Sequence, residues 1–200
     1  AQRIDVAQGL SFGGLMTFPA VGQAAEAEVW LESARNLLSA SGLACETITS
    51  GGTPDMWRIP QGNIVTEYRP GTYIYMDRYQ VSKGAATLDD CAATVLSTVV
   101  SRPTPTRAIL DAGSKALTSD TLGLPDHGEL IGEPGARIVA LSEEHGKVEL
   151  PETSALRVGD RVRVLPDHIC PVVNLYDQVY LISGDRVVDV LPVAARGRLS

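Results

Sequence analysis

The feature that most constrains this fold is a change of pattern part-way along the chain. Up to residue 83, strand-like segments alternate with a helix, whereas after Pro103 short strands follow one another with turns between them. Strand–helix alternation is typical of a parallel sheet or an α/β barrel. Successive turn-separated strands are typical of an antiparallel barrel or sandwich. We therefore predict an α/β part over residues 1–83 and a β domain over residues 84–200.

The first part contains one clear helix signal. Between Gln23 and Ser41, apolar residues recur at helical spacing, and Gly42 stands where a helix often ends. Short apolar or β-branched runs around this helix predict strands. The predicted strands are Leu10–Phe18 (taken as buried), Ala44–Thr49, Ile64–Glu67 and Thr72–Met76.

The second part is predicted to be almost entirely strand. One segment, Asp90–Ser101, stays open: a capping box at Thr87 and Asp90 favours a helix, whereas its valines favour a strand. Turns such as Val158-Gly159-Asp160 separate the other segments. The predicted strands are Arg107–Leu110, Arg137–Leu141, Lys147–Leu150, Arg161–Leu165, Gln178–Ile182 and Arg186–Val190.

Composition excludes several classes of function. The 200 residues carry a net charge of -7 and no basic run, which argues against a nucleic-acid partner. No apolar run approaches the length of a membrane span. The three cysteines are odd in number and far apart, which favours a reducing compartment over a disulfide framework. With no leader-like start, we expect a cytoplasmic protein.

Asp167-His168-Ile169-Cys170 is the candidate metal site. If this segment is a strand, His168 and Cys170 point to the same face. An imidazole beside a thiolate suits a borderline-soft divalent ion, zinc above all. The spacing is weak alone, because a His-x-Cys pair is more often a packed cysteine beside a surface histidine. The case therefore depends on neighbouring motifs.

A glycine turn, Ser50-Gly51-Gly52-Thr53, follows one of the predicted strands. Glycines let backbone amides approach a phosphate closely, and hydroxyl groups add further donors. From the residues alone, a polar turn at a strand end is the simpler interpretation. Neither interpretation is excluded at this point.

Several motifs, taken in order, resemble the D-threonine aldolase and D-serine dehydratase family. The resemblance covers essentially the whole chain. It implies the carboxyl-terminal part of an alanine-racemase-like (β/α)8 barrel followed by an antiparallel β domain. It also implies pyridoxal 5'-phosphate and a divalent metal as cofactors. The motifs are Phe12–Thr17, Ser50–Pro54, Arg69–Asp77, Asp111–Leu117, Glu143–Gly146 and Asp167–Leu175.

The resemblance assigns roles to particular residues. His168 and Cys170 become the metal ligands, with zinc favoured over manganese or magnesium because one ligand is a thiolate. Arg69 matches an arginine that faces the cofactor's pyridine nitrogen in racemases, with a structural salt bridge as the alternative. His145 is a candidate for a supporting or substrate contact. The implied phosphate contacts are Ser50, Gly51, Gly52, Gly71 and Thr72.

No residue of this chain is assigned as catalytic. The family's Schiff-base lysine lies on the first barrel strand, in a segment to which nothing here corresponds. Lys115 matches a motif of the β domain and Lys83 has no motif around it, so neither replaces that lysine. We expect that the chain alone shows no turnover and that an amino-terminal half, supplied by a second chain or otherwise, is needed.

The implied function is a metal-assisted lyase that acts on a D-configured β-hydroxy amino acid, as a dehydratase or an aldolase. Two alternatives stay open: a racemase-like enzyme whose metal pair is vestigial, and a non-catalytic protein that carries the cofactor or regulates. The implied partners are a small D-amino acid and a second copy of the chain in a homodimer. In such dimers the barrel of one subunit meets the β domain of the other.

Overall fold

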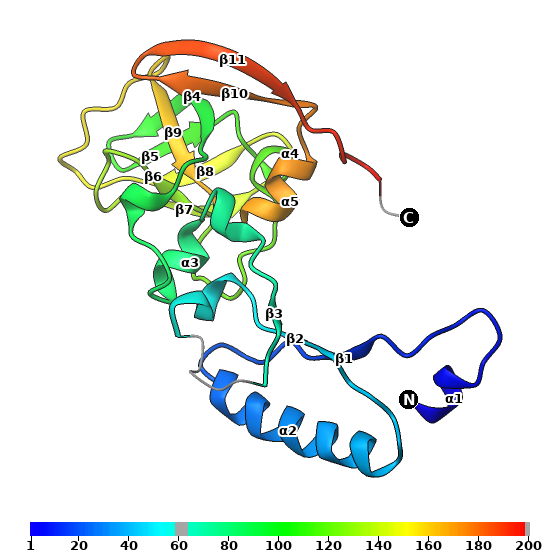
Figure 1. Cartoon of the computed structure of the whole chain (residues 1–200). Coiled ribbons are helices and arrows are strands. Elements are labelled where there is room, and N and C mark those ends of the chain that lie inside the picture. Colours follow the sequence, from blue (N-terminus) through cyan, green and yellow to red (C-terminus); the bar gives the residue numbers. More distant parts are fainter. Residues whose placement is uncertain (59–63, 199–200) are drawn as a thin grey trace. The chain divides into compact units, whose positions relative to one another are not determined.

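The computed structural model describes residues 1–58 and 64–198. It divides into two compact units (Figure 1). Unit 1 consists of Ala1–Tyr73 and Lys83–Ala85, and unit 2 consists of Ile74–Ser82 and Ala86–Ser200. Each unit has its own sheet and its own buried cluster, so each is described by itself.

Unit 1 is built on a parallel sheet with the order β1-β2-β3. Strand β1 (Gly14–Met16) leads through α2 (Ala24–Ala40) to β2 (Thr47–Ser50), and β3 (Glu67–Tyr68) completes the sheet. A helix joining two parallel neighbours is the α/β unit that the sequence predicts. The rest of the regular structure described in this unit is the short α1 (Gln2–Asp5), the 3-10 turn η1 (Thr53–Arg58) and the start of the 3-10 turn η2 (Thr72–Ile74), whose last residue belongs to unit 2.

Three of the strands expected in unit 1 need correction. The one predicted over Ile64–Glu67 overlaps β3 only at Glu67. The strand predicted over Thr72–Met76 is wrong, because η2 occupies its start and Met76 has φ +53°, which a strand cannot contain. The segment Leu10–Phe18 contains only the three-residue β1 and is not buried, since Met16 is 72% exposed and Phe18 is 74% exposed.

Unit 2 contains a six-stranded antiparallel sheet with the order β6-β9-β4-β5-β8-β7. The two ends of this order meet, because the His127 N–H beside β6 donates to the Ile138 carbonyl of β7 at 3.0 Å. The sheet therefore curls into a nearly closed barrel. Its strands are β4 (Val95–Thr104), β5 (Arg107–Leu110), β6 (Glu129–Leu130), β7 (Arg137–Leu141), β8 (Gly146–Glu149) and β9 (Arg161–Leu165).

The open segment Asp90–Ser101 contains both predicted features. The 3-10 turn η3 (Leu88–Asp90) has the reciprocal capping box of Thr87 and Asp90, and β4 begins five residues later. The capping box therefore starts a single 3-10 turn rather than a long helix. The β-branched residues that follow are strand, as their propensity favours.

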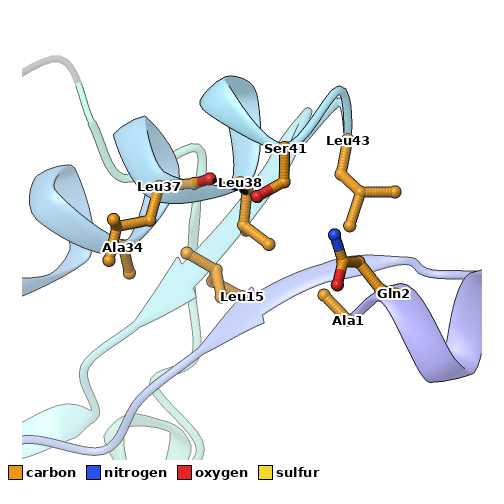
Figure 2. Close-up of a pocket in the computed structure, with 8 residues that line it drawn as sticks. All are labelled: Ala1, Gln2, Leu15, Ala34, Leu37, Leu38, Ser41 and Leu43. Carbon is orange, nitrogen blue, oxygen red and sulfur yellow. Dashed lines mark hydrogen bonds between the residues drawn. The ribbon is translucent and has the colours of Figure 1, made fainter.

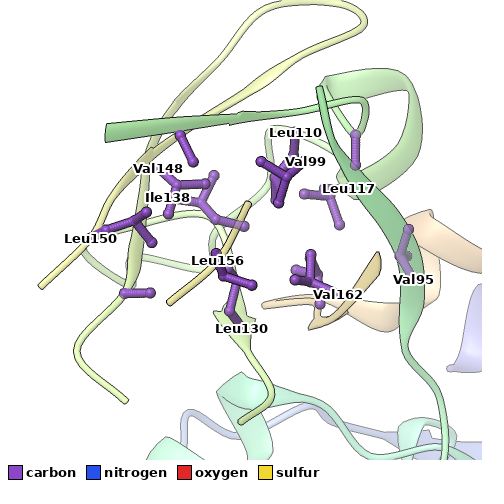
Figure 3. Packing of buried hydrophobic residues seen from close by; sticks show 14 of the residues in the cluster. Val95, Val99, Leu110, Leu117, Leu130, Ile138, Val148, Leu150, Leu156 and Val162 are labelled. Carbon is purple, nitrogen blue, oxygen red and sulfur yellow. The ribbon is translucent and has the colours of Figure 1, made fainter. Parts of the chain in front are cut away.

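The interior of the barrel is filled by aliphatic side chains (Figure 3). Strand β9 shows why: Val162 and Val164 alternate with the exposed Arg161 and Arg163, so one face packs and the other is solvated. Burying each such valine contributes about 1.5–3 kcal/mol. The labelled members are Val95, Val99, Leu110, Leu117, Leu130, Ile138, Val148, Leu150, Leu156 and Val162.

Three short helices and a hairpin complete unit 2. The helices are α3 (Arg78–Ser82), α4 (Ser114–Leu117) and α5 (Ile169–Asn174), and the hairpin pairs β10 (Gln178–Ser183) with β11 (Arg186–Pro192). Both strands of the hairpin lie where the sequence predicts strands, whereas none of the three short helices was predicted. Within the described residues, none of the helices has both the length and the apolar character of a membrane span.

Candidate functional site

The glycine turn follows β2 directly. Ser50 ends the strand and is 4% exposed, and Gly51 has φ +81°. A Cβ added to Gly51 would lie 2.1 Å from the Tyr68 ring, and one added to Gly52 would lie 3.0 Å from the Phe18 ring. Gly51 is therefore required both by the close approach of the Tyr68 ring and by its backbone conformation, whereas the exposed Phe18 ring could move away from a side chain at position 52.

Gly71 and Thr72 follow the neighbouring strand, β3. The parallel register places Ser50 opposite Tyr68, so the two segments leave the sheet at the same carboxyl edge. A Cβ added to Gly71 would meet nothing within 4 Å. The five residues implied as phosphate contacts therefore come from the ends of two adjacent strands, an edge where α/β folds commonly bind ligands.

A buried hydroxyl without a hydrogen-bond partner in the described part of the chain lies beside the glycine turn, which suits the binding of an anion. The Thr53 hydroxyl, next to Gly52, is buried and has no hydrogen-bond partner among the described residues. A buried hydroxyl without a partner is costly, and a phosphate oxygen would accept its hydrogen bond. The nearby Asp55 carboxylate is already engaged, because it accepts the Gly22 N–H at 2.7 Å and pairs with Arg58 at 3.5 Å.

Arg69 ties the same strand ends together. Its Nη1 donates to the Thr49 hydroxyl at 2.5 Å, and its Nη2 donates to the Thr17 carbonyl at 2.7 Å. These bonds connect the residues that follow β1 and β3 to the middle of β2. Arg69 was expected either to face the cofactor's pyridine nitrogen or to form a structural salt bridge. Its contacts in the structure are of the structural kind, but they are hydrogen bonds to neutral oxygens rather than a salt bridge.

The expected strand at His168 and Cys170 is wrong. Strand β9 ends at Leu165, His168 is the N-cap of α5 with φ -133° and ψ 100°, and Cys170 is the second residue of that helix. Pro171 explains the helix start: it has no N–H for a strand ladder but is tolerated in a first helical turn. The pair therefore lies at a strand-to-helix turn, which we call the metal turn (residues 166–171).

Asp77 holds the metal turn in place. Its carboxylate is fully buried and accepts the Ile169 N–H and the Gln80 N–H, each at 3.0 Å. Burial raises the pKa of Asp77, although these amide hydrogen bonds act in the opposite direction. The bond to Ile169 fixes the backbone between the two candidate ligands. Two backbone bonds, from Arg78 to Pro166 and from Tyr79 to Asp167, support the same turn.

A cluster of ion pairs with two buried carboxylates lies next to the metal turn. Arg78 pairs with Asp126 and with Asp167, the latter at 2.9 Å, and Arg137 pairs with Asp126 at 3.1 Å. Asp126 and Asp167 are 4% and 3% exposed. Burial raises the pKa of Asp167 to about 6, against the stabilising effect of Arg78 on its charged form. The cluster anchors the residue immediately before His168.

His168 contacts both a thiol and a carboxylate. Its Nδ1 lies 2.8 Å from Asp120 Oδ2. Hydrogen bonding with Cys170 and with Asp120 raises the pKa of His168 to about 9, against the opposing effect of burial. Over residues 1–58 and 64–198, no three His, Cys, Asp or Glu side chains are grouped so that they could hold a metal. His168 and Cys170 are therefore a candidate pair rather than a complete set of metal ligands among the described residues.

Among the described residues, the other lysine, cysteine and histidine candidates do not combine a thiol and a carboxylate around one side chain as His168 does. Lys115 is exposed and pairs with Glu144 at 2.5 Å, which raises its pKa. Burial and the nearby Asp77 and Asp90 raise the pKa of the Cys91 thiol to about 11, so this thiol is protonated and unreactive at neutral pH. His145 is exposed in the turn after β7, where its backbone N–H donates to the Ser142 hydroxyl at 3.3 Å.

A separate apolar pocket in unit 1 lies between α2 and β1 (Figure 2). In the described part of the chain, its lining includes no acidic, basic, histidine or cysteine side chain. It therefore contains no group for acid–base or metal chemistry. The lining residues are Ala1, Gln2, Leu15, Ala34, Leu37, Leu38, Ser41 and Leu43.

Comparison with known proteins agrees with this geometry. The model of a family described as "Putative serine dehydratase domain" matches residues 92–182. D-threonine aldolase of Arthrobacter sp. is 35% identical over 211 residues, which cover 98% of this chain and 55% of the relative. The chain belongs to the D-threonine aldolase and D-serine dehydratase family. It spans about half the length of that aldolase.

A shorter relative matches along nearly its whole length. An uncharacterized protein of Mycobacterium tuberculosis is 41% identical over 128 residues, which cover 61% of this chain and 96% of the relative.

Solved structures show the same fold. D-threonine aldolase from Filomicrobium marinum has a TM-score of 0.84 and 27% identity, covering 100% of this chain and 57% of that chain. D-threo-3-hydroxyaspartate dehydratase from Delftia sp. HT23 has a TM-score of 0.75 and 26% identity, covering 92% and 56%. A cysteine-to-alanine variant of such a dehydratase, solved in a metal-free form, has a TM-score of 0.75 and 25% identity, again covering 92% and 56%. The alanine-racemase-like fold is thus confirmed.

Proposed function

We propose that this chain provides the phosphate-binding strand ends and the metal turn of a pyridoxal-phosphate lyase acting on a D-configured β-hydroxy amino acid. The observation that carries the proposal is the metal turn, where His168 contacts Cys170 and is held by Asp120. The relatives support the substrate class, because they are named for D-threonine and D-3-hydroxyaspartate. Aldolase and dehydratase activities both fit this site.

The metal is proposed to be zinc. A nitrogen and a sulfur donor suit zinc better than manganese or magnesium, which prefer oxygen ligands. A dehydratase of this family has been studied as a cysteine-to-alanine variant in a metal-free form, and another structure of it carries a histidine-to-alanine change two residues earlier. His168 and Cys170 have the same spacing. When bound, the metal would act as a Lewis acid on the substrate β-hydroxyl.

Residues at the sheet edge of unit 1 are proposed to hold the cofactor phosphate. The carboxyl ends of the adjacent strands β2 and β3 carry Ser50, Gly51, Gly52, Gly71 and Thr72. The buried Thr53 hydroxyl beside them has no hydrogen-bond partner among the described residues and could donate to a phosphate oxygen. Arg69 fixes these strand ends through Thr49 and Thr17. When bound, pyridoxal 5'-phosphate would supply an electron sink for the substrate α-carbon.

A homodimer in the cytoplasm completes the proposal. The β10–β11 hairpin offers a surface for a second copy, because seven of its apolar side chains are 42–60% exposed. These side chains are Tyr180, Leu181, Ile182, Val187, Val188, Val190 and Leu191. Light scattering of the purified protein would show two copies per particle.

The function is tested by reconstitution. The chain is co-expressed with the lysine-bearing amino-terminal half of the Arthrobacter aldolase, loaded with pyridoxal 5'-phosphate and zinc, and assayed with D-threonine and D-serine. We expect the reconstituted protein to cleave or dehydrate the D-amino acids. His168→Ala should abolish this activity, and L-threonine should not be a substrate. Racemisation of alanine that persists in His168→Ala would favour the racemase-like alternative, and binding of cofactor with no reaction would favour a carrier.

A further inference from the structure

Asp120 approaches the imidazole of His168 from a loop that follows α4. Its Oδ2 lies 2.8 Å from His168 Nδ1, while its Oδ1 accepts the Leu122 N–H at 3.1 Å. The Asp120 N–H in turn donates to the Thr118 hydroxyl at 3.3 Å. The two oxygens of one carboxylate are therefore directed separately, one to the loop and one to the histidine.

The loop that presents Asp120 is held in a costly backbone conformation. Thr118 and Leu122, on either side of it, have φ +63° and φ +51°. A positive φ is uncommon for residues with a Cβ, and for a β-branched residue such as Thr118 it costs on the order of 1–3 kcal/mol. The Asp120 side chain is 49% exposed, and an ion pair so exposed contributes little to stability. Stability alone therefore gives little reason for this arrangement.

The contact has a consequence for the chemistry of the imidazole. A histidine binds a metal through one ring nitrogen, and the group bonded to the other nitrogen decides which one is available. With Nδ1–H donated to Asp120, Nε2 is the nitrogen left to bind. Carboxylates that hold metal-binding histidines in this way fix the ring orientation and raise its basicity.

We propose that Asp120 is a positioning residue for the metal turn: it accepts Nδ1–H of His168 and thereby presents Nε2 to the metal. The inference rests on the proposed function, because it assumes that His168 is a ligand. Asp120 itself does not bind the metal. It lies 48 residues before His168 in sequence, and the sequence pattern gave no sign of their contact.

The test uses the full chain and zinc alone. Zinc affinity is measured by competition with a chelator for the unmodified chain, Asp120→Ala, Asp120→Asn and the control Asp185→Ala, which changes an exposed carboxylate in the β10–β11 turn. We expect Asp120→Ala to weaken binding by about 10–100-fold. Asp120→Asn keeps an acceptor oxygen and should lose less than tenfold, and the control should not change.

A second readout separates positioning from a merely structural effect. In the zinc-loaded chain, the ¹⁵N spectrum of His168 should show a protonated Nδ1 and a metal-bound Nε2, and Asp120→Ala should broaden or mix these signals. Zinc bound through Nδ1, or an affinity of Asp120→Ala within twofold of the unmodified chain, would overturn the role of Asp120 alone. A chain that binds no zinc would overturn the metal turn as well, and with it the proposed function.

Discussion

The two units of this chain differ sharply in how much they bury. Among the described residues, sixteen buried apolar residues form the cluster inside unit 2, whereas three, Leu31, Ile48 and Ile64, form the cluster of unit 1. In unit 1, large apolar side chains such as Phe18, Leu37 and Trp57 are 72–74% exposed. Apolar burial is the dominant favourable term in folding, so the two units should differ in stability.

This difference bears on function. The metal turn lies on the well-packed unit 2, where the buried carboxylates of Asp77 and Asp167 hold its backbone and its neighbouring side chains in place. The strand ends proposed to bind phosphate lie on the unit with little core, where three short strands and one long helix support them. We infer that metal binding is the more robust of the two proposed properties.

The largest expected effect comes from the core of the barrel. Leu110 is fully buried, and Leu110→Ala should lower the free energy of unfolding by about 3–4 kcal/mol through lost burial and a cavity. Leu31→Ala is the matched variant in unit 1. If the comparison is right, Leu31→Ala increases hydrogen exchange only within unit 1, whereas Leu110→Ala destabilises the whole of unit 2. Equal loss of protection in both units would contradict it.

A second prediction concerns the ion cluster of unit 2. Arg78→Met leaves the buried Asp167 without its cationic partner and leaves Asp126 with Arg137 alone, which should cost about 3 kcal/mol in urea denaturation. Lys115→Met removes an exposed ion pair and should not measurably change stability. Equal stability of the two variants would show that the cluster does not support the metal turn.

Amide hydrogen exchange of the unmodified chain is a third test of the expected difference in stability between the two units. Strands β4, β5 and β8 lie in the interior of the sheet order, so their amides should exchange more slowly than those of β1 and β2 by about tenfold or more. Mass spectrometry of peptides along the chain resolves the two sets. Protection of β1 and β2 equal to that of β4 would mean that unit 1 is stabilised by something other than its three-residue cluster.

The smallest expected effect is a pH dependence within unit 2. Burial opposes, but hydrogen bonds from the Thr98 amide and the Ser97 hydroxyl outweigh it and lower the pKa of Asp111. A lowered pKa means that the ionised carboxylate stabilises the folded state above the unfolded pKa of about 4, and this contribution is lost as the pH falls below that value. The stability advantage over Asp111→Asn should therefore shrink below pH 4. An advantage that is constant with pH would contradict the assignment.

Much of this architecture is predictable from the sequence because its signals are local. Strands β5, β7 and β9 begin and end at the residues that the sequence predicts, and the Thr87–Asp90 capping box forms as expected. The apolar run around the metal turn predicts a strand, but Pro166 and Pro171 bracket this segment, and Pro171 has no N–H for a strand ladder. Asp77 and Asp120 were not predicted as supports, since their contacts with the metal turn span 92 and 48 residues and leave no local pattern.

The most direct test of this account is the zinc content of four variants of the chain. His168→Ala and Cys170→Ala remove the proposed ligands, whereas His145→Ala and Cys91→Ala remove a histidine and a thiol from elsewhere in unit 2. After equilibration with zinc and removal of the excess, atomic absorption should find about one zinc per chain in the unmodified protein and in both controls. It should find none in the first two variants, with unchanged circular dichroism. Zinc retained in both His168→Ala and Cys170→Ala would contradict the account.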